Sequence, residues 1–430
     1  MKSVDYVPGH GDRRFGVDDY HLVLDYKVGT NHLTALATVQ LTIAEPTNTI
    51  ALDLANLSVS RVKVDGRAAR FSHTERKLRI TLPGKAKPGD AFRVEVAYGG
   101  KPRPMASPFG LVGWEELTDG VLVAAQPCGA PSWFPCNDRP DDKAGYTFDI
   151  TAPDAYRVVA NGVLLGRQRR AGKSTWRYRQ SQPMAPYLAV VHVGRYIATP
   201  VADGVEIVHP RGVRVGAGTA FARQAEMVAT FTDLFGPYPF DDYRAVIAAD
   251  PLEIPLEAQS LTTFGVNHVE ATWDNERLVA HELAHQWFGN SLTVADWADI
   301  WLHEGFACYS EWLWSEASGR RSVDDWAAEH HRRLAAKPQD LLLGAPGRAL
   351  IFDDRVYKRG ALTLHAIRGV LGDSFFDMLR DWTETYRWGV VSTEAFVAHL
   401  QRYSEAGVAG LIDAWVYAKP LPPITARAAK

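Results

Sequence analysis

Several features that mark other protein classes are scarce in this sequence. Three cysteines in 430 residues, Cys128, Cys136 and Cys308, are an odd number without CxxC spacing, which argues against a disulfide framework or a thiolate metal site. Cys128 and Cys136 would pair only in a secreted protein. No apolar run reaches membrane-spanning length, and the first twenty residues lack the apolar core of a signal peptide. The net charge of −3 provides no basic surface for nucleic acid. These absences predict a cytoplasmic protein with free thiols that binds neither nucleic acid nor membrane.

The pattern of apolar residues changes once along the chain. Up to about Ile197, runs such as His32 to Ala44, Lys77 to Leu82 and Phe92 to Tyr98 alternate in the manner of strands, with turn residues between them. Beyond it, helical spacing predominates, beginning with 220–236. We therefore expect an α+β, multidomain protein, with an all-β domain of antiparallel sheets over residues 1–197 and a mostly helical catalytic domain over 198–430.

The segment HELAHQWFGN, from His281 to Asn290, contains a pattern typical of metal sites. His281 and His285 are four residues apart, so on a helix both imidazoles lie on one face and reach one metal ion. Glu282 lies about 100° further round the helix, where it acts beside the metal without binding it. Two imidazoles and a carboxylate that takes a proton from metal-bound water are what a zinc hydrolase needs. The pattern also arises by chance, in which case both histidines are ordinary core or surface residues.

A helix over this segment is predicted from its flanking residues. Asp274 and Asn275 offer capping side chains at the start, and Gly289-Asn290 is a stop signal at the end. Between them runs an apolar stripe made of Leu278, Leu283, Trp287 and Phe288.

Glu304 is the candidate third ligand; eighteen residues separate it from His285, and it lies near the start of another predicted helix. A first-turn glutamate is also favoured by the helix dipole, so its position alone leaves a role without metal open. Together, His281, His285 and Glu304 form a His2Glu set with one open position, which is typical of catalytic rather than structural zinc. We predict one Zn2+ per chain.

Two further segments carry polar residues of interest. The stretch from Val121 to Phe148 holds Gln126 and an acidic, proline-rich turn, which would be ordinary loop structure if taken alone. The strand-like stretch LEIPLEAQSLTTFG places Glu253 and Glu257 just before the predicted metal-binding helix.

Along the chain, LEIPLEAQSLTTFG, HELAHQWFGN and WLHEG follow one another, and together they resemble the gluzincin aminopeptidases, the family of aminopeptidase N and the leukotriene epoxide hydrolase/aminopeptidase. FPCNDRPDDKAGYTFDI is similar to the family's FPC-x-D-x-P-x-x-K-A segment, and the resemblance extends from about Tyr20 to Ile424. It implies a saddle-like antiparallel β domain followed by a thermolysin-like, mostly α catalytic domain. It also implies that His281, His285 and Glu304 bind zinc and that Glu282 is the general base.

The resemblance assigns three more residues. Tyr357 in VYKRG matches the tyrosine of the family's Y-x-K-G segment, whose phenol stabilises the oxyanion; otherwise it would be an interfacial aromatic residue. Glu257 matches the glutamate that grips the substrate's α-amino group, and Gln126 matches a glutamine that helps it.

This sequence departs from the family in places. The family's G-x-M-E-N strand is here the run from Ile254 to Ala258, which keeps only the glutamate, and Pro255 removes a backbone donor. His303 stands where asparagine is common and is a candidate second-layer partner of the site. The sequence stops near KPLPP, where the family's large helical C-terminal domain would follow, so we expect a more open site.

These observations predict a zinc aminopeptidase that acts on peptides with a free N-terminus. An alternative is a zinc hydrolase with another role on the same scaffold, such as epoxide hydrolysis or maturation of one dedicated peptide. A third hypothesis is a binding scaffold without activity. Such a scaffold would need none of the five residues that the chemistry uses, which are His281, Glu282, His285, Glu304 and Tyr357.

Overall fold

The computed structural model describes residues 5–404 and 408–424. They form two compact units, each assembled from separate stretches of chain. The sheet unit comprises residues 7–213 and 240–267, and the helical unit comprises residues 5–6, 214–239, 268–404 and 408–424. The domains predicted from the sequence, 1–197 and 198–430, are continuous stretches of chain, unlike these two units. The predicted domain boundary therefore stays a prediction.

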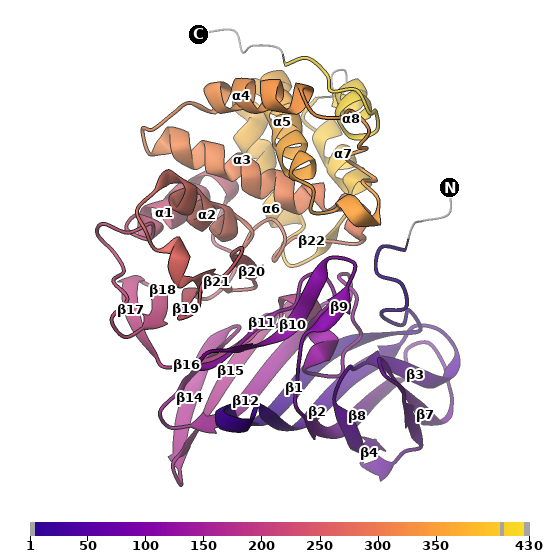
Figure 1. Cartoon of the computed structure of the whole chain (residues 1–430). Helices are drawn as coiled ribbons and strands as arrows, with labels where there is room; N and C mark the ends of the chain where they lie inside the picture. Colours follow the sequence, from indigo (N-terminus) through magenta and orange to yellow (C-terminus); the bar gives the residue numbers. More distant parts are fainter. Residues whose placement is uncertain (1–4, 405–407, 425–430) are drawn as a thin grey trace. The chain divides into compact units, whose positions relative to one another are not determined.

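The sheet unit contains four sheets, and most of their strands are labelled in Figure 1. In sheet order, the eight-stranded sheet consists of β14 (Val163–Arg170), β15 (Lys173–Met184), β12 (Ala144–Pro153), β1 (Phe15–Lys27), β2 (His32–Ile43), β8 (Ala91–Gly100), β4 (Ser58–Val64) and β5 (Arg67–Ala68). A three-stranded sheet consists of β3 (Thr47–Asp53), β7 (Lys77–Ala86) and β6 (Phe71–His73). A five-stranded sheet consists of β13 (Arg157–Ala160), β16 (Val191–Gly194), β11 (Gly120–Ala124), β10 (Gly110–Leu117) and β9 (Met105–Ser107).

The fourth sheet is mixed. Its order is β17 (Tyr196–Ala202), β18 (Val205–Pro210), β19 (Tyr243–Ala248), β21 (Leu261–Gly265) and β20 (Leu256–Ala258). The inner strands β18, β19 and β21 run parallel, and β20 pairs antiparallel with β21 at the edge. Of the strand-like stretch 252–265, only residues 256–258 and 261–265 form strands, and they make a hairpin that turns at Ser260, whose φ is +61°.

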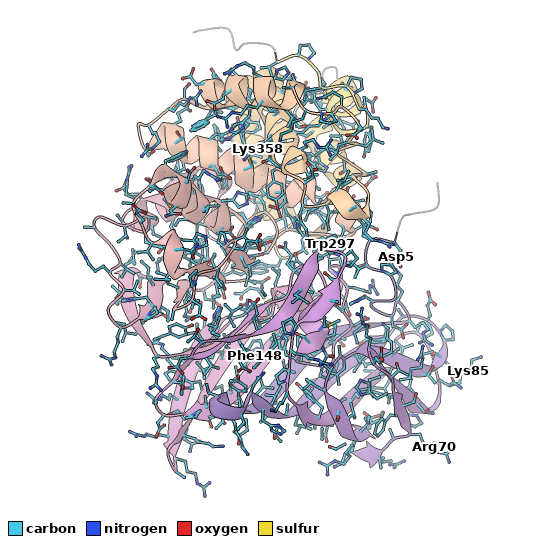
Figure 2. All side chains as sticks on the ribbon, in the orientation of Figure 1. Asp5, Arg70, Lys85, Phe148, Trp297 and Lys358 are labelled. Carbon is cyan, nitrogen blue, oxygen red and sulfur yellow. The ribbon has the colours of Figure 1, made fainter. Side chains whose placement is uncertain are left out.

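The alternation of residue types along its strands explains which side chains of the eight-stranded sheet are buried. In β2 every second residue from Leu33 to Ile43 is buried, as a strand with one covered face requires. The core beneath it is strongly aromatic: Tyr20, Tyr146 and Phe148, the last labelled in Figure 2, are fully buried, and Tyr146 stacks on both of the others.

One pairing in this sheet differs from the expected antiparallel arrangement. β1 and β12 are parallel, with Tyr20 opposite Tyr146. The two strands are separated by more than a hundred residues, so no turn fixes their relative direction, and their pairing carries no local signal in the sequence.

The helical unit contains eight helices among the described residues, together with a two-stranded parallel sheet of β22 (Thr293–Val294) and β23 (Val390–Val391). The helices are α1 (Gln224–Phe235), α2 (Trp273–Ala284), α3 (Trp301–Ala317), α4 (Val323–Ala335), α5 (Asp354–Leu371), α6 (Phe375–Thr385), α7 (Thr393–Gln401) and α8 (Val408–Val416). The predicted α+β class is confirmed, with a β-rich N-terminal part and a mostly helical remainder.

Helices α3 and α5 pack closely against each other and lie side by side in Figure 1. At the crossing, a Cβ atom added to Gly360 would lie 2.7 Å from the Cα atom of Gly305. Only glycine at both positions lets the two backbones touch here. The contact comes directly after Glu304 on α3 and three residues after Tyr357 on α5, so it sets the spacing between two candidate site residues.

Candidate functional site

Helix α2 and the turn after it carry both candidate histidine ligands. The helix is capped by Thr272, whose side chain accepts a hydrogen bond from Asn275 N, so Asp274 and Asn275 lie inside the first turn and the prediction that they cap it was wrong. Threonine serves because its oxygen reaches a backbone N–H that has no helical partner.

The end of α2 also differs from the prediction. The helix ends at Ala284 rather than at Gly289-Asn290, because the next turn tightens into hydrogen bonds from Gln286 N to Leu283 O and from Trp287 N to Ala284 O. His285 keeps helical angles, with φ −57° and ψ −21°, and its ring centroid lies 4.9 Å from that of His281. The four-residue spacing therefore brings the two imidazoles together, as predicted.

Glu304 in the first turn of α3 completes the cluster. Its Oε2 atom lies 3.5 Å from Nε2 of His281 and 3.5 Å from Nε2 of His285. Two ligand atoms at about 2.1 Å from a tetrahedral zinc ion are roughly 3.4 Å apart, so these distances are those of a zinc site. All three side chains are buried, which suits a built site better than a chance surface group. The residues present therefore fit one zinc ion.

A second layer of hydrogen bonds orients the imidazoles. Nδ1 of His281 lies 2.7 Å from Oε1 of Glu311 on α3, and Nδ1 of His285 lies 2.9 Å from the carbonyl oxygen of Phe288. Each Nδ1–H therefore donates outward, which leaves the Nε2 lone pair for the metal. Arg277 in turn binds Oε2 of Glu311 at 3.2 Å.

Sequence reasoning missed Glu311. Its signal was its position seven residues after Glu304, two helical turns along the same face, where an acidic group lies close to the first imidazole.

The charged groups of this cluster stabilise one another, as the pKa values of His281 and Glu304 indicate. Burial alone would lower the pKa of His281, but hydrogen bonds that its imidazole donates to the carboxylates of Glu304 and Glu311 raise it to about 9 in the metal-free protein. Burial alone would raise the pKa of Glu304, but His285 and His281 hold it well below its usual range. Glu304 is therefore an anion at neutral pH, as a carboxylate ligand must be.

Glu282 and Tyr357 belong to the same unit as the three donors. Glu282 follows His281 on α2 and is buried. Tyr357 lies in the first part of α5, and its ring is 6.0 Å from that of His281, with the two planes 18° apart. The next residue, Lys358, is labelled in Figure 2; its Nζ lies 3.2 Å from Sγ of Cys308 on α3. All three cysteines are free and buried, as predicted.

His303 binds a neighbouring strand through the backbone. Its Nε2 accepts a hydrogen bond from Val294 N at 2.9 Å, so the imidazole joins the start of α3 to β22. A role of His303 as a second-layer partner of the zinc site stays a prediction.

In the sheet unit, the structure joins the other two predicted site residues. Gln126 donates a hydrogen bond from Nε2 to Oε1 of Glu257, across 131 positions of sequence. Glu257 is buried in the edge strand β20, opposite Thr262 of β21. The amide thus holds the carboxylate in place, which matches the predicted partnership between the two residues.

Comparisons with known proteins agree with this geometry. Residues 17–188 match the family model of the Peptidase M1 N-terminal domain, and residues 220–415 match that of the Peptidase family M1 domain. A solved structure of the M1 zinc metallopeptidase from Deinococcus radiodurans, bound to a Tyr-Ser-Ala substrate, is 31% identical, with a TM-score of 0.91 and 99% of each chain covered.

The curated relatives are longer than this chain. Leucine aminopeptidase 2 of Pyricularia oryzae is 28% identical over 62% of this chain and 46% of its own length. Leucyl aminopeptidase of Saccharolobus solfataricus is 24% identical over 95% of this chain and 53% of its own length. The chain thus spans about half the length of the curated relatives it matches. The matched family and the donor set together confirm the predicted cofactor, one catalytic Zn2+.

Within the residues that the structure describes, none of the helices is both long and apolar enough to span a membrane. The cytoplasmic location stays a prediction.

Proposed function

Since the chain belongs to the M1 family of zinc metallopeptidases, we propose that it is a zinc aminopeptidase, which hydrolyses the N-terminal peptide bond of peptides. The observation that carries this proposal is the convergence of His281, His285 and Glu304 at the spacing of zinc ligands. A set of two imidazoles and one carboxylate leaves a coordination position for the reaction, whereas structural zinc sites are closed.

The three ligands hold a metal that, when bound, supplies Lewis acidity at the scissile carbonyl. Glu282 is the general base: its carboxylate accepts a proton from the attacking water and then donates it to the nitrogen of the leaving amine. Because Glu282 follows His281 on the same turn of α2, its carboxylate starts beside the metal ligands.

Tyr357 stabilises the charge that develops on the substrate. Its phenol donates a hydrogen bond to the carbonyl oxygen as that oxygen becomes an oxyanion. The contact of its ring with that of His281 supports this role, because it keeps the phenol within the helical unit's metal cluster.

Glu257 and Gln126 select the free N-terminus. The Glu257 carboxylate forms a charge-assisted hydrogen bond with the substrate's α-ammonium group, and Gln126 fixes the carboxylate's orientation. Only the first peptide bond then lies over the metal, which makes the enzyme an exopeptidase.

Glu282→Gln tests the mechanism. We expect a loss of about 10³-fold or more in kcat/KM, because a general base typically contributes 10²–10⁴-fold, with one zinc per chain retained. Glu270→Gln, which changes an exposed glutamate just before α2, is the matched control and should behave as the wild type. A Glu282→Gln protein that keeps zinc and most of its activity would contradict the assignment.

A panel of peptides and aminoacyl-anilides, free and N-acetylated, tests the substrate class. Only substrates with a free N-terminus should be cleaved, and Glu257→Gln should lower kcat/KM for them. Rapid cleavage of acetylated peptides would refute the role of Glu257. Zinc-loaded protein that cleaves no member of the panel would instead favour the alternative, a zinc hydrolase specialised for an epoxide or for one dedicated peptide.

A further inference from the structure

Arg359, two residues after Tyr357 on α5, has a set of partners that the mechanism above does not use. Its side chain is buried, with 3% of the residue exposed, and it meets the end of α8 and the chain that follows it. Nε donates to Trp415 O at 2.8 Å, and Nη1 donates to Lys419 O at 2.7 Å. Nη2 donates to the carbonyl oxygens of Ala414, Ala418 and Pro420.

Ala414 and Trp415 lie in the last turn of α8, where a helix leaves its carbonyl groups without helical partners, and the other three acceptors belong to the chain just beyond it. A cation there also interacts favourably with the helix dipole. No carboxylate among residues 5–404 and 408–424 lies within ion-pair distance of Arg359, so the backbone carbonyls provide its entire charge compensation within those ranges. Burial lowers the pKa of Arg359 to about 10, which still leaves the guanidinium charged at neutral pH.

The position of Arg359 on α5 connects this cluster to Tyr357. Residues two apart lie about 200° apart round a helix, so the two side chains leave α5 on nearly opposite faces. One face carries the phenol toward His281, and the other holds α8. Arg359 thus holds the first turns of α5 from the face opposite the zinc-binding residues.

Polar contacts at this end of α5 also reach other elements: Lys358 Nζ lies 3.2 Å from Sγ of Cys308, and Asp354 pairs with Lys337. At the crossing with α3, Gly360 meets Gly305 backbone to backbone. Of the residues from Asp354 to Lys358, only Val356 is buried. A tyrosine oxygen lies about 8 Å from its helix axis, so a rotation of about 10° would move it by roughly 1.4 Å, and displacements near 1 Å are enough to cost about 10²-fold in rate.

We propose that Arg359 is a positioning residue for catalysis: by clamping α5 to the stretch from Ala414 to Pro420, it fixes the Tyr357 phenol at the oxyanion. This inference rests on the proposed peptidase function. It gives the segment after α8, Ala418 to Pro420, a part in setting the rate of the reaction.

The test is a double-mutant cycle between positions 359 and 357. Arg359→Met should lower kcat by about 10- to 100-fold with KM within about twofold of the wild type and zinc content unchanged, because an oxyanion contact matters only in the transition state. In a Tyr357→Phe background, where there is no phenol to position, the same substitution should change kcat by less than about twofold. Arg359→Lys, which keeps the charge but has fewer donors, should be intermediate. Arg380→Met on α6, which removes an ion pair with Asp377, is the control and should leave kcat unchanged.

A second variant perturbs the acceptors instead of the arginine. Truncation after Tyr417 removes three of the carbonyl partners, Ala418, Lys419 and Pro420, and should reproduce the fall in kcat. If Arg359→Met does not fold, as judged by circular dichroism, the cycle is run with Arg359→Lys and with the truncated chain.

Equal losses of kcat in the presence and absence of the Tyr357 hydroxyl would overturn the proposal, because they would show that Arg359 acts through general stability. Unchanged kcat in the truncated chain would overturn it as well. A wild-type protein that hydrolyses no substrate would refute the proposed function itself and the inference with it, whereas an active wild type with additive losses refutes only the role of Arg359.

Discussion

Replacing Glu311 by glutamine should weaken zinc binding without touching a zinc ligand. Glu311 accepts the Nδ1–H of His281 at 2.7 Å and is bound by Arg277 at 3.2 Å, and its residue is only 3% exposed. Burial would raise the pKa of Glu311, but Lys358, His281 and Arg277 hold it well below its usual range, so the group is an anion at neutral pH. Glutamine keeps the shape and removes the charge.

The expected size of the effect follows from this geometry. Loss of such an outer partner typically costs 10- to 100-fold in metal affinity, which is about 1.4–2.7 kcal/mol. The value should fall toward the upper end, because glutamine also leaves Arg277 and Lys358 without their shared anion in a buried setting.

The assay is competition for zinc against a chelator of known affinity at constant pH. Glu329→Gln is the matched control, because Glu329 pairs with Arg321 and Arg333 on and beside α4, away from the donor cluster. Wild-type zinc affinity in Glu311→Gln would refute the view that the second layer of hydrogen bonds builds the site.

Two further results are expected. The apparent zinc affinity should rise about tenfold per pH unit as pH increases toward about 9 and then level off. The reason is that His281 has a pKa of about 9 without metal and must lose a proton to bind zinc. Chelator competition from pH 6 to 10 measures this dependence, and an affinity that does not change with pH would contradict the prediction. Gly360→Ala should lower the free energy of unfolding by about 1–3 kcal/mol and reduce kcat, because the new Cβ would lie 2.7 Å from Cα of Gly305 and would force α3 and α5 apart. In the control Gly369→Ala, on the same helix, the new Cβ meets nothing within 4 Å and should stabilise α5 by about 0.5–1 kcal/mol. Thermal unfolding and kcat of the two variants separate the steric effect at the crossing from the effect of alanine on helix stability.

Most of the metal site could be predicted from the sequence, because short-range helix geometry determines where its ligands lie. His281 and His285 share a helical face by spacing alone, and Glu304 begins the next long helix, so the geometry of a helix largely decides their convergence. Glu311 obeys the same rule but lacks a distinctive neighbour, and an acidic residue among aromatic ones in α3 did not stand out.

The parts that sequence reasoning missed depend on long-range packing. Thr272 rather than Asp274 caps α2, because capping depends on where the chain enters the helix and several adjacent polar residues qualify. The parallel pairing of β1 with β12 and the clamp of Arg359 on Ala414 to Pro420 join segments far apart in the chain. Neither has a local pattern that would reveal it.

A crystal structure of the zinc-loaded protein, with anomalous data collected at the zinc absorption edge, would show how the metal is bound. We expect one strong peak at about 2.0–2.2 Å from Nε2 of His281, Nε2 of His285 and a carboxylate oxygen of Glu304. A peak bound through either Nδ1, a peak at a cysteine sulfur, or a Glu304 carboxylate turned away from the metal would contradict this expectation.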